Sequence, residues 1–233
     1  MAFIIVLALC LVLKIFVICT TINEIKIRRQ RKIYCAQNNI DDDCLPGVCF
    51  FVLRRLADVI ISGLVCLTIL PILFVFLTPL IKLTSKGPVI FKQKRIGIFG
   101  KEFVCYKFRS MYVSEDFSMT KMDDARVTPI GLIIRKTHID EFVQFFNILK
   151  GDMSLIGPRP YSDDVVKNRD HFQNWQKRVL VRPGLTGWAQ INSPRMMNAE
   201  QVLDCDLAYL ESMSLKKDAF IFFETLKFKD VSY

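Results

Sequence analysis

Two adjacent carboxylates, Asp140 and Glu141, open the run DEFVQFFNILK, residues 140–150, which is predicted to be a helix that Gly151 ends. The start of a helix offers free N–H groups and a positive partial charge, which keep carboxylates ionised and attract phosphate. A deprotonated Asp140 in such a position is a plausible nucleophile or metal ligand. The structural alternative is a capping box, because Thr137 precedes Asp140 by three residues. On spacing alone the cap is favoured, although it accounts for one acid and not for two.

The same run predicts a helix with a buried apolar face. Its apolar residues recur at helical spacing at Ile139, Phe142, Val143, Phe146 and Leu149. Asp140, Glu141 and Gln144 are then expected on other faces.

Three later features carry further candidates. Pro158 and Pro160 fix the backbone on either side of Arg159, whose guanidinium suits bidentate phosphate contact. The stretch VRPGLTGWAQIN, residues 181–192, is either a packed turn or a wall of a substrate site. Further on, two side chains share a helix face at i, i+3, namely Asp206 and Tyr209.

Composition places this chemistry at a membrane. The 233 residues are 52% hydrophobic and carry a net charge of +9, and the mean hydropathy is +0.29. The apolar excess is concentrated in residues 1–22 and 59–81. Positive charge suits anionic lipid or a phosphorylated substrate, whereas no basic helix with interleaved aromatic residues indicates nucleic acid. The eight cysteines form no CxxC pair, which argues against zinc and is typical of a reducing compartment.

The first apolar segment predicts an N-terminal transmembrane helix over residues 1–25, although Lys14 interrupts it. The basic run KIRRQRK at residues 26–32 follows it, so this end is expected on the cytoplasmic side and Met1 outside. Residues 26–47 are expected to form a basic and polar linker.

The second apolar segment predicts a re-entrant membrane helix over residues 48–83. Residues 59–81 contain no charge, yet basic residues flank both ends, which places both ends on the cytoplasmic side. Pro71 lies near the midpoint and kinks the helix. An ordinary kinked span is the alternative.

Residues 84–233 are expected to form a cytoplasmic domain of α+β class that is mostly helical. Val89 to Phe91 and Glu102 to Phe108 predict a small hairpin around Gly97 and Gly100. Its basic side chains, among them Arg95 and Lys107, are expected to lie against anionic lipid or to bind substrate phosphate, and the two roles are compatible. Pro129 predicts the start of a helix that runs to about Arg135.

Three blocks of this domain together resemble the bacterial sugar transferases, the monotopic polyprenyl-phosphate phosphoglycosyl transferases. The blocks are GPVIFKQKRIGIFGKEFVCYKFRSM, DEFVQFFNILKGDMSLIGPRP and RPGLTGWAQIN, in that order. The resemblance covers residues 51–230. It implies transfer of a phosphosugar from a nucleoside diphosphate sugar, by family habit a UDP-sugar, to polyprenyl phosphate, commonly undecaprenyl phosphate, with release of UMP. Such a reaction starts surface glycan assembly on the cytoplasmic face of the bacterial inner membrane.

The resemblance also assigns residues. The family's catalytic dyad falls on Asp140 and Glu141, with Asp140 as the nucleophile that forms a phosphoryl-aspartate and with Mg²⁺ expected near Asp140. Glu141 then serves as second carboxylate, metal partner or orienting group. The candidate phosphate contacts are Arg159, Arg182, Lys107 and Arg95, and the family's late Asp-x-x-Tyr pattern falls on Asp206 and Tyr209.

One departure and two other functions stay open. The family breaks its re-entrant helix at Ser-Pro, whereas this chain has Leu70-Pro71 and so lacks that hydroxyl. The first alternative function is a non-catalytic membrane scaffold in polysaccharide assembly. The second is a phosphatase or nucleotide-sugar hydrolase with water as acceptor. A homo-oligomer is compatible with the sequence.

Overall fold

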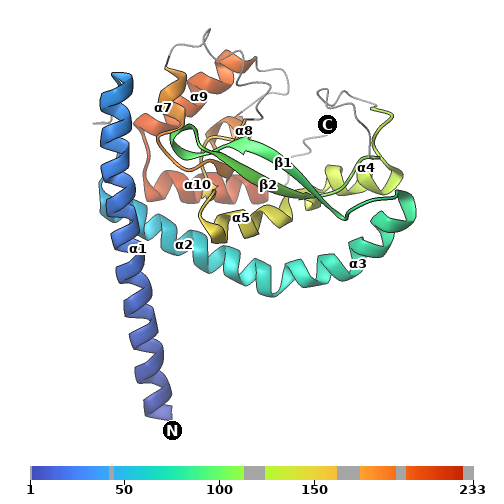
Figure 1. The fold of residues 1–233 in the computed structure, drawn as a ribbon, viewed down its shortest axis with the longest axis horizontal. Coiled ribbons are helices and arrows are strands. Elements are labelled where there is room, and N and C mark those ends of the chain that lie inside the picture. Colours follow the sequence, from blue (N-terminus) through green and yellow to red (C-terminus); the bar gives the residue numbers. More distant parts are fainter. Residues whose placement is uncertain (1, 42–44, 113–123, 162–173, 193–197, 228–233) are drawn as a thin grey trace.

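The computed structural model describes residues 2–41, 45–112, 124–161, 174–192 and 198–227. These residues form a mostly helical molecule with two small two-stranded sheets. Figure 1 shows one long helix, α1, standing against a compact body whose lower edge is an arc made by α2 and α3. The α+β, mostly helical class predicted from the sequence is therefore confirmed.

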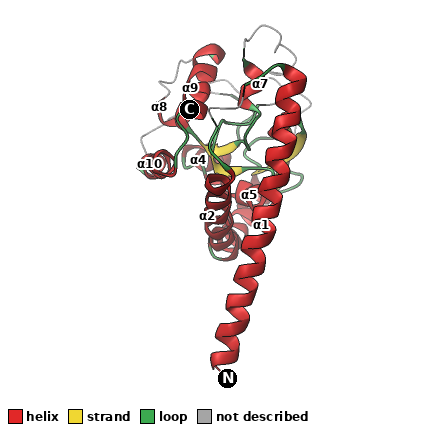
Figure 2. Ribbon diagram, turned by 90° about the vertical axis from the view of Figure 1, so that its left-hand side faces the viewer, coloured by secondary structure: helices red, strands yellow, loops and turns green. Residues whose placement is uncertain are grey.

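The long helix α1 spans Ala2–Asn38. Buried residues on its C-terminal half recur at helical spacing and form one stripe, Thr20, Glu24, Arg31 and Cys35. The N-terminal half extends well beyond the body of the protein (Figures 1 and 2). The linker predicted over residues 26–47 is wrong as far as Asn38, because Lys, Arg and Gln are good helix formers and the buried stripe packs α1 against α2.

The arc consists of α2 (Val48–Leu67) and α3 (Ile69–Thr84), which meet at Thr68 with a bend of 45°. The bend lies three residues before Pro71, which has no N–H for the Leu67 carbonyl and whose ring crowds that turn. The Thr68 hydroxyl donates to the Leu64 carbonyl at 2.7 Å, so a hydroxyl is present near the bend although position 70 is leucine.

The described helices include no single one that is long and apolar enough to cross a membrane, whereas the bent pair α2–α3 could do so by length and composition. The N-terminal transmembrane helix and the re-entrant course of α2–α3 therefore stay predictions.

The predicted hairpin is confirmed. Strands β1 (Ile90–Ile96) and β2 (Glu102–Phe108) pair antiparallel, with Arg95 opposite Phe103 and Phe91 opposite Lys107. A 3₁₀ turn, η1 (Ile98–Gly100), joins them. Phe103, Cys105 and Phe108 of β2 are buried. By alternation along the strand, Lys107 shares the face of Phe103 and Cys105, and Phe108 lies on the other face.

The remaining elements follow the hairpin. Helix α4 spans Pro129–Lys136, as predicted, and Thr128 caps it by accepting from the Gly131 N–H. Then come η2 (Ile139–Val143), α5 (Gln144–Lys150), β3 (Ser154–Ile156), α7 (Trp175–Arg178), β4 (Gly184–Thr186), α8 (Trp188–Asn192), α9 (Ala199–Glu211) and α10 (Leu215–Leu226). Strands β3 and β4 pair parallel. A buried cluster that includes Ile148, Leu155 and Tyr209 joins α5, β3 and α9.

Candidate active site

The dyad lies in the 3₁₀ helix η2, and no capping box holds it. Thr137 ends α4 instead, where its hydroxyl donates to the carbonyls of Ile133 and Ile134 at 2.9 and 3.2 Å. His138 then turns the chain through a positive φ of 53°. The predicted cap on Asp140 is therefore wrong, because the residue that would form it completes the preceding helix.

The predicted buried face of η2 and α5 is confirmed at Val143, with Ile139 and Phe142 packed against a core cluster, and is wrong at Phe146. Asp140, Glu141 and Gln144 are buried, whereas Phe146 is 52% exposed. The reason is Asn147, which is fully buried: its amide oxygen accepts from the Tyr106 N–H at 3.1 Å and its amide nitrogen donates to the Val104 carbonyl at 2.7 Å. These bonds to β2 turn the polar face inward.

Two cations enclose Glu141. Lys107 of β2 lies 2.7 Å from its Oε1, and the Arg159 guanidinium bonds both carboxylate oxygens, with the Oε2 contact at 3.3 Å. Burial alone would raise the pKa of Glu141, but Arg159 and Lys107 hold that pKa well below the usual range. Glu141 is therefore an anion at neutral pH, and it fixes two cations beside the dyad.

Asp140 is in a different state. Burial raises the pKa of its carboxyl and the Glu141 carboxylate adds to this, while Lys107 acts in the opposite direction. Within the described ranges its carboxylate has no hydrogen-bond or ion-pair partner. A buried carboxylate that is not engaged by its surroundings suits a nucleophile, because its lone pairs stay available to a substrate.

The Gly-Pro-Arg-Pro loop owes its position to close backbone packing. A Cβ on Gly184 would lie 2.2 Å from the Gly157 nitrogen, and one on Gly187 would lie 2.1 Å from the Gly157 oxygen. The Gly157 N–H donates to the Thr186 carbonyl at 2.8 Å, and the Gly184 N–H donates to the Pro158 carbonyl at 2.9 Å. The Arg-Pro-Gly-Leu-Thr-Gly stretch is therefore the support on which the Arg159 loop rests.

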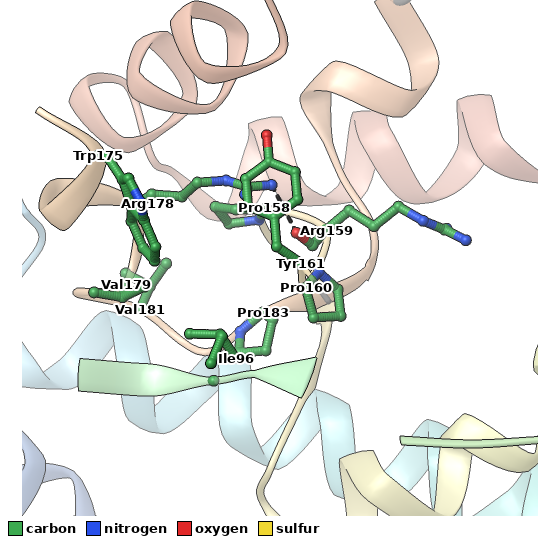
Figure 3. Close-up of a pocket in the computed structure, with 11 residues that line it drawn as sticks. Ile96, Pro158, Arg159, Pro160, Tyr161, Trp175, Arg178, Val179, Val181 and Pro183 are labelled. Atoms are coloured by element: carbon green, nitrogen blue, oxygen red, sulfur yellow. Dashed lines mark hydrogen bonds between the residues drawn. The ribbon is translucent and has the colours of Figure 1, made fainter. Parts of the chain in front are cut away.

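A second support is Arg178, which the sequence analysis did not single out. Its Nε lies 2.6 Å from the Asp206 carboxylate, its Nη2 donates to the Arg159 carbonyl at 2.6 Å, and it stacks 3.6 Å from the centre of the Tyr161 ring. Figure 3 shows Arg178 reaching across the pocket to the Arg159 main chain while the Arg159 side chain points away. The sequence offered no signal for it, because one arginine in NWQKRVLVRPG looks like any other.

The predicted phosphate contacts separate into two groups. Lys107 and Arg159 meet at Glu141, and Arg95 lies close by, where it donates to the Pro160 carbonyl at 2.8 Å. Arg182 does not join them. It donates to the Gly151 carbonyl at 3.1 Å and pairs with Glu24 of α1 at 2.8 Å.

The Asp-x-x-Tyr pair also does not reach the dyad directly. Asp206 acts on Arg178, and Tyr209 is fully buried and donates to Asp218 at 2.6 Å. Asp218 in turn lies 3.6 Å from the Arg54 guanidinium of α2. Both residues of the pattern therefore stabilise the structure around the site.

No group of three or more metal-binding side chains gathers in the part of the chain that the structure describes. Glu141 is a poor candidate ligand because two cations bind its oxygens. Asp140 remains as one buried carboxylate. Mg²⁺ is commonly held by one or two carboxylates together with substrate phosphates, so this donor set fits Mg²⁺ bound jointly with a diphosphate.

The fold and site define a class, and comparison with known proteins shows it: the chain belongs to the bacterial sugar transferase family, which residues 50–229 match. The chain is 43% identical over 195 residues to a "UDP-glucose:undecaprenyl-phosphate glucose-1-phosphate transferase" of Klebsiella pneumoniae, covering 79% of this chain and 41% of the relative. It is 38% identical over 190 residues to a "UDP-N-acetylgalactosamine-undecaprenyl-phosphate N-acetylgalactosaminephosphotransferase" of Aeromonas hydrophila, covering 78% and 45%. The chain thus spans less than half the length of these two relatives.

A shorter relative is covered more fully. The "Uncharacterized sugar transferase EpsL" of Bacillus subtilis is 40% identical over 169 residues, which covers 72% of this chain and 82% of that protein. The matched family region begins at residue 50, so α1 lies outside it.

Proposed function

We propose that this protein transfers a sugar 1-phosphate from a UDP-sugar to undecaprenyl phosphate and releases UMP, the first step of a surface glycan. Family membership and the names of the relatives support the reaction class. The observation that carries the proposal is the dyad geometry: an unengaged buried Asp140 stands next to a Glu141 that holds Lys107 and Arg159 in place.

The reaction proceeds in two displacements. An Asp140 carboxylate oxygen attacks the phosphorus next to the sugar, a new O–P bond forms, and the P–O bond to UMP breaks with its electron pair leaving on UMP. A phosphate oxygen of the lipid then attacks the same phosphorus and the Asp140 carboxylate leaves. Dividing the transfer in this way lets one site serve a water-soluble donor and a membrane-bound acceptor in turn.

The surrounding side chains supply charge and orientation. Lys107 and Arg159 lie where they can face the negative charge of the diphosphate, and Glu141 keeps both in position. Because the pKa of Glu141 is depressed, this residue orients the site and does not donate a proton at neutral pH. Mg²⁺, held by Asp140 and the diphosphate, would neutralise substrate charge and stabilise the leaving group.

The membrane location belongs to the same proposal. The bent pair α2–α3 carries exposed apolar side chains that suit lipid contact: Leu64, Leu67, Ile72, Val75, Phe76 and Leu83. With basic residues on both flanks, the pair enters and leaves on the cytoplasmic side of the bacterial inner membrane. The first half of α1, which extends beyond the body, is then the transmembrane part.

Nucleotide release tests the reaction. Purified protein in detergent, with Mg²⁺ and undecaprenyl phosphate, is given UDP-sugars one at a time, and UMP is distinguished from UDP. Lipid-dependent UMP release from one donor supports the proposal and names the sugar. UDP release would indicate ordinary glycosyl transfer. Free sugar phosphate formed without lipid would indicate a hydrolase, and no turnover with any nucleotide sugar would favour a scaffold.

A further inference from the structure

The contact between α1 and the catalytic domain includes a buried charge. The Glu24 side chain is 1% exposed, and its Oε1 lies 2.8 Å from Nη2 of Arg182, whose side chain is 10% exposed. Glu24 belongs to α1, outside residues 50–229 that match the family. A carboxylate is rarely buried to this extent unless it is paired with a cation, because its desolvation is costly.

Arg182, the partner of Glu24, binds the C-terminal end of α5. The last carbonyls of a helix have no partners within it. Here Arg55 donates to the carbonyls of Ile148 and Leu149 at 2.6 and 2.8 Å, and Arg182 donates to that of Gly151 at 3.1 Å. Two guanidiniums therefore hold the C-terminal end of α5, where cations are also favoured by the helix dipole. The dyad lies directly before this helix, in η2.

Two neighbouring guanidiniums need nearby negative charge, because their positive charges repel each other. Arg55 and Arg182 are close enough to repel each other, and Glu24 and Asp58 are the carboxylates that offset this charge at Arg55. Asp58 is also engaged elsewhere, since it accepts from the Ser154 hydroxyl at 2.8 Å and the Leu155 N–H at 2.9 Å. Glu24 is the carboxylate that pairs with Arg182 itself.

We propose that Glu24 is a positioning residue of the catalytic unit: by pairing with Arg182 it allows two arginines to hold the end of α5, and so it fixes the helix that follows the dyad. The N-terminal helix is then a part of the active enzyme as well as an anchor. The effect on catalysis rests on the proposed transferase function, whereas the effect on α5 does not.

Glu24 can be tested without detaching α1. Arg31 of the same helix donates to the Leu180 carbonyl at 3.0 Å and stacks 4.4 Å from the centre of the Phe51 ring. These contacts are expected to keep α1 packed against the rest of the protein when Glu24 is replaced. Glu24→Gln keeps the size and removes the charge. Glu211→Gln, at an exposed position of α9, is the matched control.

The first measurement is hydrogen–deuterium exchange on the full-length protein. Glu24→Gln is expected to speed exchange of the amides at 148–152 about tenfold and to leave those of α9 unchanged. Exchange at 148–152 that equals wild type, or that rises equally in α9, would overturn the proposal. This readout does not depend on catalysis, so it decides the inference even if no donor is turned over.

Kinetics and a second variant complete the test. Glu24→Gln is expected to lower kcat about tenfold per folded molecule and to change KM for the UDP-sugar less than about twofold. If Glu24→Gln does not fold, Glu24→Gln with Arg182→Gln is examined, because removing both charges leaves no unpaired ion and folding should return. A double variant less stable than either single one would refute the pairing.

Discussion

The carbonyl oxygen of Arg159 accepts a hydrogen bond of 2.6 Å from Arg178, and this bond ties the Pro-Arg-Pro loop to the Asp206 ion pair. The Arg178 and Asp206 side chains are 4% and 1% exposed, so this ion pair is shielded from water. The Arg159 side chain therefore reaches Glu141 from a main chain that this hydrogen bond holds in position.

Arg178→Gln should lower both stability and activity. It leaves Asp206 as an unpaired buried charge, which costs about 3 kcal/mol in the free energy of unfolding. The double variant Arg178→Gln with Asp206→Asn should regain much of that stability. Its activity should stay low, because the Arg159 carbonyl has lost its donor. Thermal unfolding and UMP release separate the two effects, and full activity in the double variant would contradict this role.

Asp140→Asn should abolish turnover and leave the protein folded. A carboxyl whose pKa is raised by folding favours its neutral form, so its ionisation opposes folding above the usual aspartate pKa. An uncharged amide removes that penalty, and the Tm at about pH 8 should equal or exceed that of wild type. Near-normal rates would exclude Asp140 as the nucleophile.

Glu141→Gln should differ from Asp140→Asn in stability. The pKa of Glu141 is depressed, so its charge stabilises the fold at neutral pH, and this stability is lost as the pH falls through the folded pKa. Without it, Lys107 and Arg159 lose their shared carboxylate. Arg159 is 40% exposed, so water can solvate its charge once the carboxylate is gone. A decrease of about 2 kcal/mol in the free energy of unfolding is therefore expected. Calorimetry of the two variants at neutral pH checks this order, which equal Tm values would contradict.

Lys107→Gln should move the acid side of the pH profile. Asp140 must be deprotonated to attack, so kcat/KM falls as the pH drops through its pKa. Burial raises that pKa, and Lys107 is the largest influence that opposes the rise. Removing Lys107 should therefore shift the acid limb of kcat/KM to higher pH. A limb that stays in place would mean that another group controls it.

Gly184→Ala should disrupt the loop that carries Arg159, because the new methyl would lie 2.2 Å from the Gly157 nitrogen. We expect a loss of about 2 kcal/mol or more in stability together with activity. Gly63→Ala is the control, because a Cβ there meets nothing within 4 Å and alanine favours the helix. Equal Tm values for the two variants would contradict the close packing.

The sequence determined much of the local structure. Two β-like runs around Gly97 and Gly100 predicted the hairpin of β1 and β2, although β1 runs on to Ile96. Pro129 predicted the start of α4, and Gly151, with its φ of 96°, ends α5 as predicted. The motif blocks also identified Asp140 and Glu141 as the dyad candidates and led to the right family. These features depend on residues close together in the chain, where backbone preference and spacing decide the outcome.

Only the tertiary structure decided how the site is held. The polar face of α5 turns inward because Asn147 meets β2, Arg182 leaves the dyad because Glu24 lies on α1, and Arg178 acts through a main-chain carbonyl. Each contact joins residues far apart in the chain, and its strength comes from burial and charge compensation. Neither residue spacing nor composition predicts these contacts, because they form only when separate elements pack together and exclude water.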